Sequence, residues 1–396
     1  MNLSKQVSCY TWERRRDNST VCVVPHQSAA LSADLVIVGA GVVGLAHAVE
    51  AHARGLSVIV VERDERAVGA SVRNFGHIAT TLQGGEAATY AAAARDRWLS
   101  LAPKAGFEVL DAGTVVVARN EAELAVLEEF AAEHPDVTRL LRPRQVRDFF
   151  PPATAEVVGG AHMPQDLRID PREAIPSLAA WLESDGVRFA WNTHAGSVGE
   201  GVVHTSRGDF RGAGIVYATG HDLDRHFPDI AETYGVKRCL LRMLEVAPPG
   251  DLRIGPAILT GTGMLRYSAL AAMPSVAAVR AKIEQQQPEI LHHGVNLMLT
   301  QRPDGSLVLG DTHHYERTHQ PFDDEDVAEL LLREGSRLLG ATLTVRRRWR
   351  GIYAESPATD FLIAQPHPGT RVVSVTSGIG MTTALGIAPA VLDQLI

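Results

Sequence analysis

The stretch "ADLVIVGAGVVGLAHAVEAHARGLSVIVVER", residues 33–63, decides the fold of the N-terminal part of the chain. The short apolar run at 35–38 predicts a buried strand, and residues 42–54 predict a helix that ends at a glycine. A second apolar run, 56–62, predicts another buried strand, which ends at Glu62. The stretch therefore predicts a βαβ unit with a glycine-rich turn after its first strand.

The glycines of this turn have the spacing GxGxxG, which is typical of dinucleotide-binding proteins. The first glycine allows a tight turn, the second lets the backbone approach a pyrophosphate, and the third lets the helix pack closely on the strand. The N-terminus of the helix carries a partial positive charge that favours phosphate. We therefore expect a cofactor at Gly39, Gly41, Val42, Val43 and Gly44.

Glu62 is placed to accept hydrogen bonds from a ribose. An acid at this position disfavours a ribose 2′-phosphate, so the turn predicts FAD or NAD rather than NADP. The other interpretation of the same stretch is an ordinary βαβ unit without a ligand.

The composition is that of an ordinary globular protein, with 45% hydrophobic and 21% charged residues. The chain has 396 residues, which favours about two domains. Its net charge of −8 offers no basic surface for nucleic acid. The only cysteines, Cys9, Cys22 and Cys239, form neither a disulfide framework nor a zinc pattern, which favours the cytoplasm. No apolar run is long enough for a transmembrane helix, so no membrane association is expected.

The first residues, 1–32, differ from the rest of the chain and are expected to form a tail before a fold that begins at Asp34. The alternative is an additional edge strand through "VCVV", residues 21–24. Further along, "GFEVLDAGTVVVARN" alternates like a hairpin around residues 111–113. His292 and His293 are expected to cap the start of a strand.

A second strand–glycine–helix unit ends the chain at 371–396, far from the first. If both units bind one cofactor, the nucleotide-binding domain must be discontinuous, with the middle of the chain inserted as a second domain. The expected fold class is α/β, with a discontinuous Rossmann-like dinucleotide-binding domain and an inserted antiparallel-sheet substrate domain. The expected segments are a tail (1–32), dinucleotide-binding parts (33–100, 155–222, 346–396) and substrate-domain parts (101–154, 223–345).

Six motifs in order resemble the FAD-dependent amine and amino-acid oxidoreductases of the glycine oxidase, sarcosine oxidase and D-amino acid oxidase superfamily over residues 34–396. They are "VIVGAGVVGL…VIVVER", "GASVRNFG", "GIVYATG", "RPDGSLVLGDT", "WRGIYAESPATDFLIA" and "SGIGMTTALG". More narrowly, "ASVRNFG" resembles a bacterial branch associated with the degradation of aminophosphonates such as 2-aminoethylphosphonate.

The resemblance implies FAD as the cofactor and gives roles to residues by position. Glu62 and Arg63 would lie at the adenosine ribose, and Gly220 at the adenine. Ser71, Arg73 and Asn74 would lie beside the pyrophosphate and the flavin. The helix that points at the flavin pyrimidine ring would start at Gly378, Gly380, Met381 and Thr382. A helix N-terminus there stabilises the negative charge of reduced flavin.

The chain departs from the family where the substrate carboxylate is held. Amino-acid-oxidising members carry an Arg where this chain has Tyr353, and sarcosine-type members carry a Lys where it has Thr382. The anionic end of the substrate must therefore be held elsewhere, and a phosphonate dianion would suit an Arg. Arg73 is one candidate for this contact, and the expected pocket residues are His77, Arg266, Tyr267, His313, His314 and Tyr353. No catalytic acid or base stands out, and no histidine has metal-ligand spacing, so no metal is expected.

The expected function is oxidation of the C–N bond of a small primary or secondary amine, with hydride transfer to flavin N5 and hydrolysis of the imine to an aldehyde. An aminophosphonate is the expected substrate, and molecular oxygen is a second partner if the enzyme is an oxidase. The alternatives are an amino-acid oxidase of the glycine, sarcosine or D-amino acid type, and an FAD-dependent alcohol dehydrogenase of the glycerol-phosphate type. A nucleotide-binding protein without catalysis is a third, and the sequence leaves the oligomeric state open.

Overall fold

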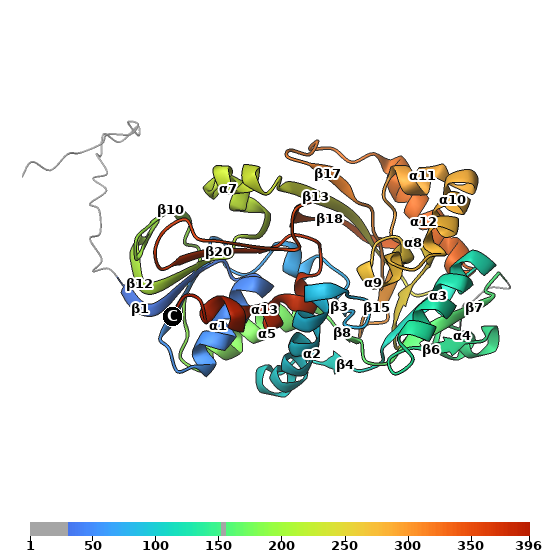
Figure 1. Ribbon diagram of the computed structural model, residues 1–396, viewed down its shortest axis with the longest axis horizontal. Coiled ribbons are helices and arrows are strands. Elements are labelled where there is room, and N and C mark those ends of the chain that lie inside the picture. Colours follow the sequence, from blue (N-terminus) through green and yellow to red (C-terminus); the bar gives the residue numbers. More distant parts are fainter. Residues whose placement is uncertain (1–30, 152–155) are drawn as a thin grey trace, which may run out of the picture.

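The computed structural model describes residues 31–151 and 156–396. The expected tail and the alternative strand at 21–24 lie outside the described residues, apart from Leu31 and Ser32 at the start of the first strand. The molecule is elongated, and its two large sheets lie at opposite ends of the long axis (Figure 1). The mixed α/β fold confirms the expected fold class.

The first large sheet has eight strands, and its centre is parallel. Strand β1 lies between β2 and β12, and it runs parallel to both. Strand β20, from the end of the chain, extends the parallel region beside β12. The strands are β1 (Leu31–Val38), β2 (Val58–Val61), β9 (Arg188–Ala190), β10 (Ala195–Gly199), β11 (Val202–Thr205), β12 (Gly208–Tyr217), β19 (Phe361–Ala364) and β20 (Thr370–Val375).

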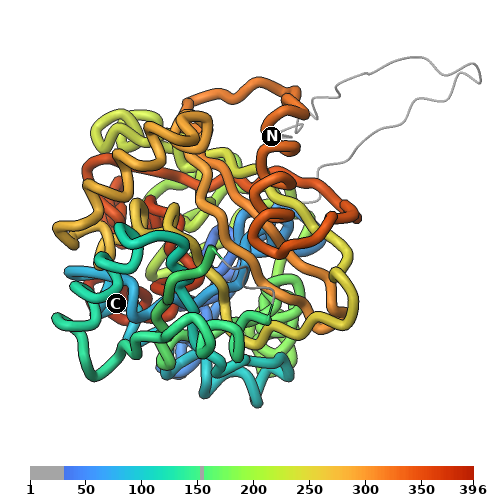
Figure 2. The backbone as a smooth tube through the Cα atoms, turned by 90° about the vertical axis from the view of Figure 1, so that its right-hand side faces the viewer, coloured from blue at the N-terminus to red at the C-terminus, as the bar shows by residue number. Residues whose placement is uncertain are grey.

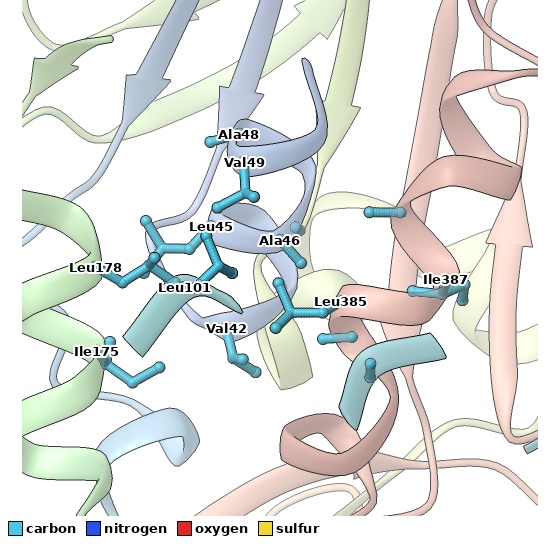
Figure 3. Close-up of a cluster of buried hydrophobic side chains, with 14 of the residues drawn as sticks. Val42, Leu45, Ala46, Ala48, Val49, Leu101, Ile175, Leu178, Leu385 and Ile387 are labelled. Atoms are coloured by element: carbon cyan, nitrogen blue, oxygen red, sulfur yellow. The ribbon is translucent and has the colours of Figure 1, made fainter. Parts of the chain in front are cut away.

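Four helices pack together beside this sheet and bury one apolar core, although they come from distant parts of the chain. Figure 3 shows Leu45, Leu178 and Leu385 from three of them pointing into the same cluster. The backbones approach closely, since a Cβ at Gly386 would lie 2.0 Å from the carbonyl oxygen of Tyr90. The helices are α1 (Val42–Ala53), α2 (Gly85–Ala105), α5 (Pro171–Ser184) and α13 (Gly380–Leu392).

The second large sheet has nine strands and is antiparallel except for the pair β5–β14. Its longest pair joins β13 and β18, from Lys237 opposite Glu355 to Val246 opposite Val345. The strands are β5 (Thr114–Ala118), β6 (Arg139–Leu141), β7 (Gly159–Met163), β13 (Lys237–Val246), β14 (Ala257–Leu259), β15 (Met298–Gln301), β16 (Leu307–Gly310), β17 (His314–Glu316) and β18 (Val345–Glu355). A small third sheet contains β3 (His77–Ile78), β8 (Leu167–Ile169) and β4 (Val109–Leu110).

Mostly short helices surround the second sheet, and Figure 2 views the molecule from this end. The longest of them, α12, begins with acidic residues and buries a stripe of leucines and valine against β13 and β16. They are α3 (Glu121–Glu133), α4 (Pro143–Phe149), α8 (Gly261–Met264), α9 (Ser268–Ala271), α10 (Val276–Gln286), α11 (Pro288–His292) and α12 (Glu325–Leu339). Between the two sheets lie α6 (Leu223–His226), α7 (Pro228–Thr233) and the 3₁₀ turns η1 (Ala70–Val72) and η2 (Gly220–Asp222).

The expected hairpin around residues 111–113 is wrong. Strand β4 pairs with β8 in the small sheet, whereas β5 pairs with β7 and β14 in the second large sheet. Gly113, with φ of +74°, turns the chain from one sheet into the other. Alternating residues identify strands, but they do not identify the partner of each strand. His292 and His293 also differ from expectation, since they end helix α11 rather than start a strand.

Two expected segment boundaries do not coincide with the sheets. Strand β7 lies in the second sheet, although its residues fall in the expected FAD-binding segment 155–222. Strand β18 also lies there, although most of it falls in the segment 346–396. The apolar residues of both strands satisfy either sheet equally well, so their partners depend on long-range pairing. After β18 the chain returns to the first sheet at β19.

Candidate active site

One cavity of about 350 Å³ lies between the two large sheets. Val38 and Tyr217 line it from the first sheet, and Met298 and Ile352 line it from the second. Both helices that follow glycine-rich turns, α1 and α13, begin at its wall. The cavity therefore brings together the two ends of the chain that the sequence marked as nucleotide-binding.

The turn after β1 leaves no room for side chains. Gly39 has φ of +104°, and a Cβ there would lie 2.4 Å from the carbonyl oxygen of Ala218. A Cβ at Gly44 would lie 1.9 Å from the carbonyl oxygen of Gly39. Helix α1 starts without an acidic residue in its first turn, and Ser71 Oγ accepts a hydrogen bond from Val42 N at 2.9 Å. The N-terminus of α1 thus begins at the cavity wall, where its partial positive charge favours an anionic pyrophosphate.

Glu62 supports the same turn from the end of β2. Its Oε2 accepts a hydrogen bond from Ala40 N at 2.8 Å, and its Oε1 accepts one from Asp64 N at 3.1 Å. The neighbouring Arg63 pairs with Asp222 at 2.5 Å across the cavity wall. Glu62, Arg63 and Gly220 all line the cavity. A carboxylate has further lone pairs, so Glu62 holds the turn and still offers acceptors to a ligand hydroxyl.

The loop after β2 is closed by the side chain of Asn74. Its Nδ2 donates to the carbonyl oxygens of Ala70 and Ser71, each at 3.0 Å, and its Oδ1 accepts from Gly76 N at 2.8 Å. Arg73 is tied to β18, because its guanidinium donates to the Arg350 carbonyl oxygen at 3.2 Å. Ser71, Arg73 and Asn74 all line the cavity.

Helix α13 begins beside this loop. Gly378 has φ of +75°, and a Cβ there would lie 3.0 Å from the ring of Tyr353. The first turn of α13 contains no acidic residue and no side-chain cap. Trp98, fully buried, donates from Nε1 to the Met381 carbonyl oxygen at 2.9 Å and fixes this turn. Gly378, Gly380, Met381 and Thr382 line the cavity, so the positive end of α13 faces it.

These features fit FAD. Glycines whose Cβ positions are occupied line the turn, and two helix N-termini point at one cavity. Two buried hydroxyls in the cavity wall, Thr219 Oγ1 and Ser377 Oγ, have no hydrogen-bond partner among the described residues. Buried polar groups are almost always paired, so these atoms indicate a polar ligand.

The far part of the cavity contains a guanidinium held by two phenols. Arg266 Nη1 donates to Tyr315 Oη at 2.8 Å, and Nη2 donates to Tyr353 Oη at 3.4 Å. In the described part of the chain, no carboxylate lies within 4.0 Å of this guanidinium. Burial raises the pKa of Tyr353 well above its usual value, so its hydroxyl keeps its proton. Arg266 therefore presents a positive charge to the cavity without a direct ion pair.

A buried carboxyl group, Asp311, lies at the end of β16 in the same cavity. Its pKa is raised to about 7 by burial, although Arg266 opposes the shift. His313 Nδ1 lies 3.7 Å from it and 3.0 Å from the Gly294 carbonyl oxygen. Burial lowers the pKa of His313 well below its usual value, so this imidazole is neutral. Asn296 lines the same wall and exchanges both backbone hydrogen bonds with Asp311, at 2.8 Å each.

Of the remaining expected pocket residues, His77 and Tyr267 line the cavity, whereas His314 does not. His77 lines the cavity, and its Nε2 lies 2.5 Å from Thr300 Oγ1. Burial lowers the pKa of His77 to about 3, so it is neutral too. Tyr267 lines the cavity and donates to the sulfur of Met298 at 3.4 Å. His314 does not line the cavity. The centroid of its ring lies 5.7 Å from that of His293 instead, because neighbours in an extended segment point to opposite sides.

Three residues of this region did not emerge from the sequence: Asn296, Asp311 and Tyr315. The sequence does contain a signal for Asp311. This acid directly follows the apolar run 307–310, so it is placed at the end of a predicted strand. Asn296 precedes an apolar run in the same way but is an ordinary loop residue by type. Tyr315 lies outside the cavity lining and reaches Arg266 only through the pairing of β17 with β13.

Several charged and polar residues lie outside the cavity. Arg347 and Arg348 on β18 are exposed, and they pair with Glu245 and Glu325, respectively. Cys239 is buried, and its pKa is raised to about 12. Within 31–151 and 156–396, no group of His, Cys, Asp or Glu is arranged to hold a metal ion. None of the helices in these ranges is long and apolar enough to cross a membrane.

Comparison with known proteins adds the family. The sequence profile of the family described as FAD dependent oxidoreductase (DAO) matches residues 34–394. The fold is similar to that of glycine oxidase from Geobacillus kaustophilus, with a TM-score of 0.75, 17% identity, and coverage of 92% of this chain and 95% of the other. L-proline dehydrogenase from P. horikoshii gives a TM-score of 0.75 and 17% identity over 92% and 93%. L-α-glycerophosphate oxidase from Mycoplasma pneumoniae, solved with FAD bound, gives a TM-score of 0.72 and 21% identity, with coverage of 92% of this chain and 94% of the other. A comparison with curated proteins finds no match.

Proposed function

The chain belongs to the family of FAD-dependent oxidoreductases, and from this premise we propose that it oxidises the C–N bond of a small amine that carries an anionic group. The best candidates are 2-aminoethylphosphonate and its N-methyl form. Bound FAD would supply the acceptor for the hydride that leaves the carbon next to nitrogen, and the resulting imine would hydrolyse to an aldehyde. The protein binds and orients the substrate and excludes water.

The observation that carries this proposal is the guanidinium of Arg266. It faces the cavity, it is held by Tyr315 and Tyr353, and among the described residues it has no carboxylate partner. A guanidinium at the cavity wall without a direct carboxylate partner favours a ligand group of opposite charge. An anionic substrate group completes the pair, and the two phenols keep the fork of N–H donors in one orientation.

The positions that hold a carboxylate in similar enzymes support a different anion. Tyr353 and Thr382 stand where an Arg and a Lys would be expected, and neither carries a positive charge. A phosphonate offers three acceptor oxygens. These match the several N–H donors of the Arg266 guanidinium better than they match the compact ammonium group of a Lys. The N-terminus of α13 lines the same cavity, where it would stabilise negative charge on the reduced ring.

Two other functions are supported by particular observations. Glycine oxidase and L-proline dehydrogenase are among the similar folds, which favours an amino acid as substrate. The similar fold of L-α-glycerophosphate oxidase favours a phosphorylated alcohol, and Arg266 would bind its phosphate equally well. The amine proposal is preferred because Asp311 places a carboxyl group in the same cavity, and a carboxylate suits a cationic amine better than a hydroxyl.

A substrate panel tests the proposal. Purified FAD-loaded enzyme is mixed with 2-aminoethylphosphonate, its N-methyl form, glycine, sarcosine, D-alanine and glycerol 3-phosphate at matched concentrations. We expect the highest kcat/KM with an aminophosphonate and the release of an aldehyde with ammonia or methylamine. Oxidation of glycerol 3-phosphate alone would replace the proposal with the alcohol function. Hydrogen peroxide formation identifies an oxidase, whereas dye reduction without peroxide identifies a dehydrogenase.

A further inference from the structure

Two buried oxygens in the cavity wall lack hydrogen-bond partners. Asp311 and Asn296 are each 3% exposed. Asp311 Oδ1 and Asn296 Oδ1 accept no hydrogen bond from any described residue. Both residues line the cavity, and their reciprocal backbone hydrogen bonds hold them side by side. Two acceptors without a donor therefore belong to neighbouring residues of one cavity wall.

A ligand that supplies N–H donors satisfies such a pair. Unsatisfied buried acceptors are costly, so native structures keep them where a ligand or water completes the bonds. The carboxylate form of Asp311 favours a donor with positive charge. A protonated amine has several N–H donors and one positive charge, and it matches both acceptors.

The charges in the cavity are arranged for a molecule with two charged ends. Arg266 and Asp311 line the same cavity, yet they do not form an ion pair within 4.0 Å. Opposite charges that face one space without touching leave room for a ligand between them. The anionic group of a zwitterion binds at Arg266, and its cationic group binds at the carboxyl end.

We propose that Asp311 and Asn296 form the subsite for the ammonium group of the substrate, and that Asp311 takes a proton from that group before oxidation. This inference rests on the proposed function. Hydride loss requires a neutral amine, because the nitrogen lone pair must form the C=N bond. In the proton transfer, an N–H bond of the ammonium breaks, its electron pair stays on nitrogen, and an O–H bond forms at a carboxylate oxygen of Asp311.

The surroundings of Asp311 suit a proton acceptor. The titratable groups that act on it or feel its charge are Arg266, Tyr267, Cys239 and His313. Burial brings the pKa of Asp311 to about 7, while both His313 and Tyr267 are neutral near that pH. Asp311 is therefore the one of these groups that changes charge near neutral pH. A base with a pKa near the working pH is the most effective.

Binding of matched ligand pairs tests the subsite. Perturbation of the flavin absorbance of the oxidised enzyme, without oxygen, gives Kd for ethylphosphonate and propionate, which cannot be oxidised at nitrogen. The Kd of 2-aminoethylphosphonate and β-alanine is measured where no reduction follows, and otherwise by rapid mixing before reduction. The matched pairs are 2-aminoethylphosphonate with ethylphosphonate, and β-alanine with propionate. In the pair that binds to the wild type, we expect the ligand with the amine to bind at least 10-fold tighter than the ligand without it. Asp311→Asn should remove this advantage, Asn296→Leu should reduce it 3-fold to 10-fold, and neither should weaken the amine-free ligand.

A pH profile tests the proton transfer. In rapid-mixing experiments without oxygen, flavin reduction by the wild type should rise as pH passes about 7 and then level off. In Asp311→Asn, the rate should be lower at pH 7 and should rise until the free amine loses its own proton, near pH 10. The exposed control Asp136→Asn should follow the wild-type profile.

The outcomes separate the two proposals. If no amine is oxidised by the wild type, the proposed function fails, whatever the variants bind. If amines are oxidised but Asp311→Asn keeps the amine advantage and the wild-type profile, the subsite is wrong and the function stands. If Asp311→Asn does not fold, Asn296→Leu decides the binding test, and an unchanged amine advantage there overturns the subsite.

Discussion

The two ends of the cavity are built in different ways. At the FAD end, backbone atoms do most of the work: the turn at Gly39, the N-termini of α1 and α13, and glycines with no room for a Cβ. At the substrate end, side chains do the work, and Arg266 and Asp311 come from different elements of the second sheet and its helices. The difference teaches that one end depends on the shape of the chain and the other on the charges placed in it.

This difference has a consequence for mutation. A change at the FAD end disturbs packing, so it should affect folding and cofactor binding together. A change at the substrate end removes a charge from a cavity wall, so it should affect substrate use and leave the cofactor in place. The predictions below run from the largest expected effect to the smallest.

Gly44→Ala should break the FAD end. A Cβ at this position would lie 1.9 Å from the backbone oxygen of Gly39, and the backbone cannot move aside without opening the turn. We expect a loss of more than about 3 kcal/mol in the free energy of unfolding and a protein without bound FAD. Gly196→Ala is the control, because its Cβ would approach no atom closer than 3.8 Å. Denaturant unfolding and the flavin spectrum measure both effects, and a folded yellow Gly44→Ala protein would contradict the prediction.

Arg266→Met should separate the two ends. It removes the charge that faces the cavity, and hydrogen bonds to charged groups contribute about 1.5–3 kcal/mol each. We expect kcat/KM for an anionic amine to fall roughly 100-fold, which corresponds to about 2.7 kcal/mol, while the flavin spectrum and Kd for FAD stay unchanged. Arg280→Met is the control, because Arg280 is exposed on α10. Steady-state kinetics check the result, and an equal loss in both variants would remove the special role of Arg266.

Glu62→Ala tests the comparison of the two ends more finely. It changes a side chain at the FAD end, where backbone atoms are otherwise the main contacts. Its carboxylate holds Ala40 N and Asp64 N, so the turn should loosen and Kd for FAD should rise by the equivalent of roughly 1–3 kcal/mol. Turnover at saturating FAD should change little. Glu65→Ala, on the exposed loop, serves as the control. Fluorescence titration of the apoprotein with FAD measures this Kd. An unchanged value would show that Glu62 does not contribute to FAD binding.

Asp311→Asn should make a smaller difference to stability, and the sign depends on pH. The carboxyl pKa is 3.8 in the unfolded chain and about 7 in the folded one, so the folded state binds the proton more tightly. Its stabilising contribution is complete below pH 3.8 and is lost as pH rises through 7. Relative to the wild type, Asp311→Asn should therefore gain about 1–2 kcal/mol of stability between pH 5 and pH 6.5.

Thermal unfolding at the two pH values, with saturating FAD, measures this change. Asp136→Asn should show the same difference from the wild type at both values, because Asp136 is exposed. A constant difference for Asp311→Asn as well would mean that the carboxyl group is not buried as the structure places it.

The sequence by itself determined the FAD end. A strand, three glycines, a helix and Glu62 lie within 31 residues, and the geometry of each step depends on its neighbours in the chain. Gly39 and Gly378 were readable for the same reason, since a positive φ and a close approach restrict the position to glycine. The α/β class and the discontinuous cofactor-binding unit followed from two such stretches at opposite ends of the chain.

Only the tertiary structure decided the substrate end. Arg266 was expected in the pocket from the sequence, but Asn296 and Asp311 were not, and the placement of all three around one cavity depends on which strands pair. The expected hairpin at residues 111–113 and the places of β7 and β18 failed for the same reason. Strand pairing is long-range, and an alternating pattern fits many partners equally well. Local sequence therefore fixes a glycine turn, whereas the charge that faces a cavity is fixed by contacts between residues far apart in the chain.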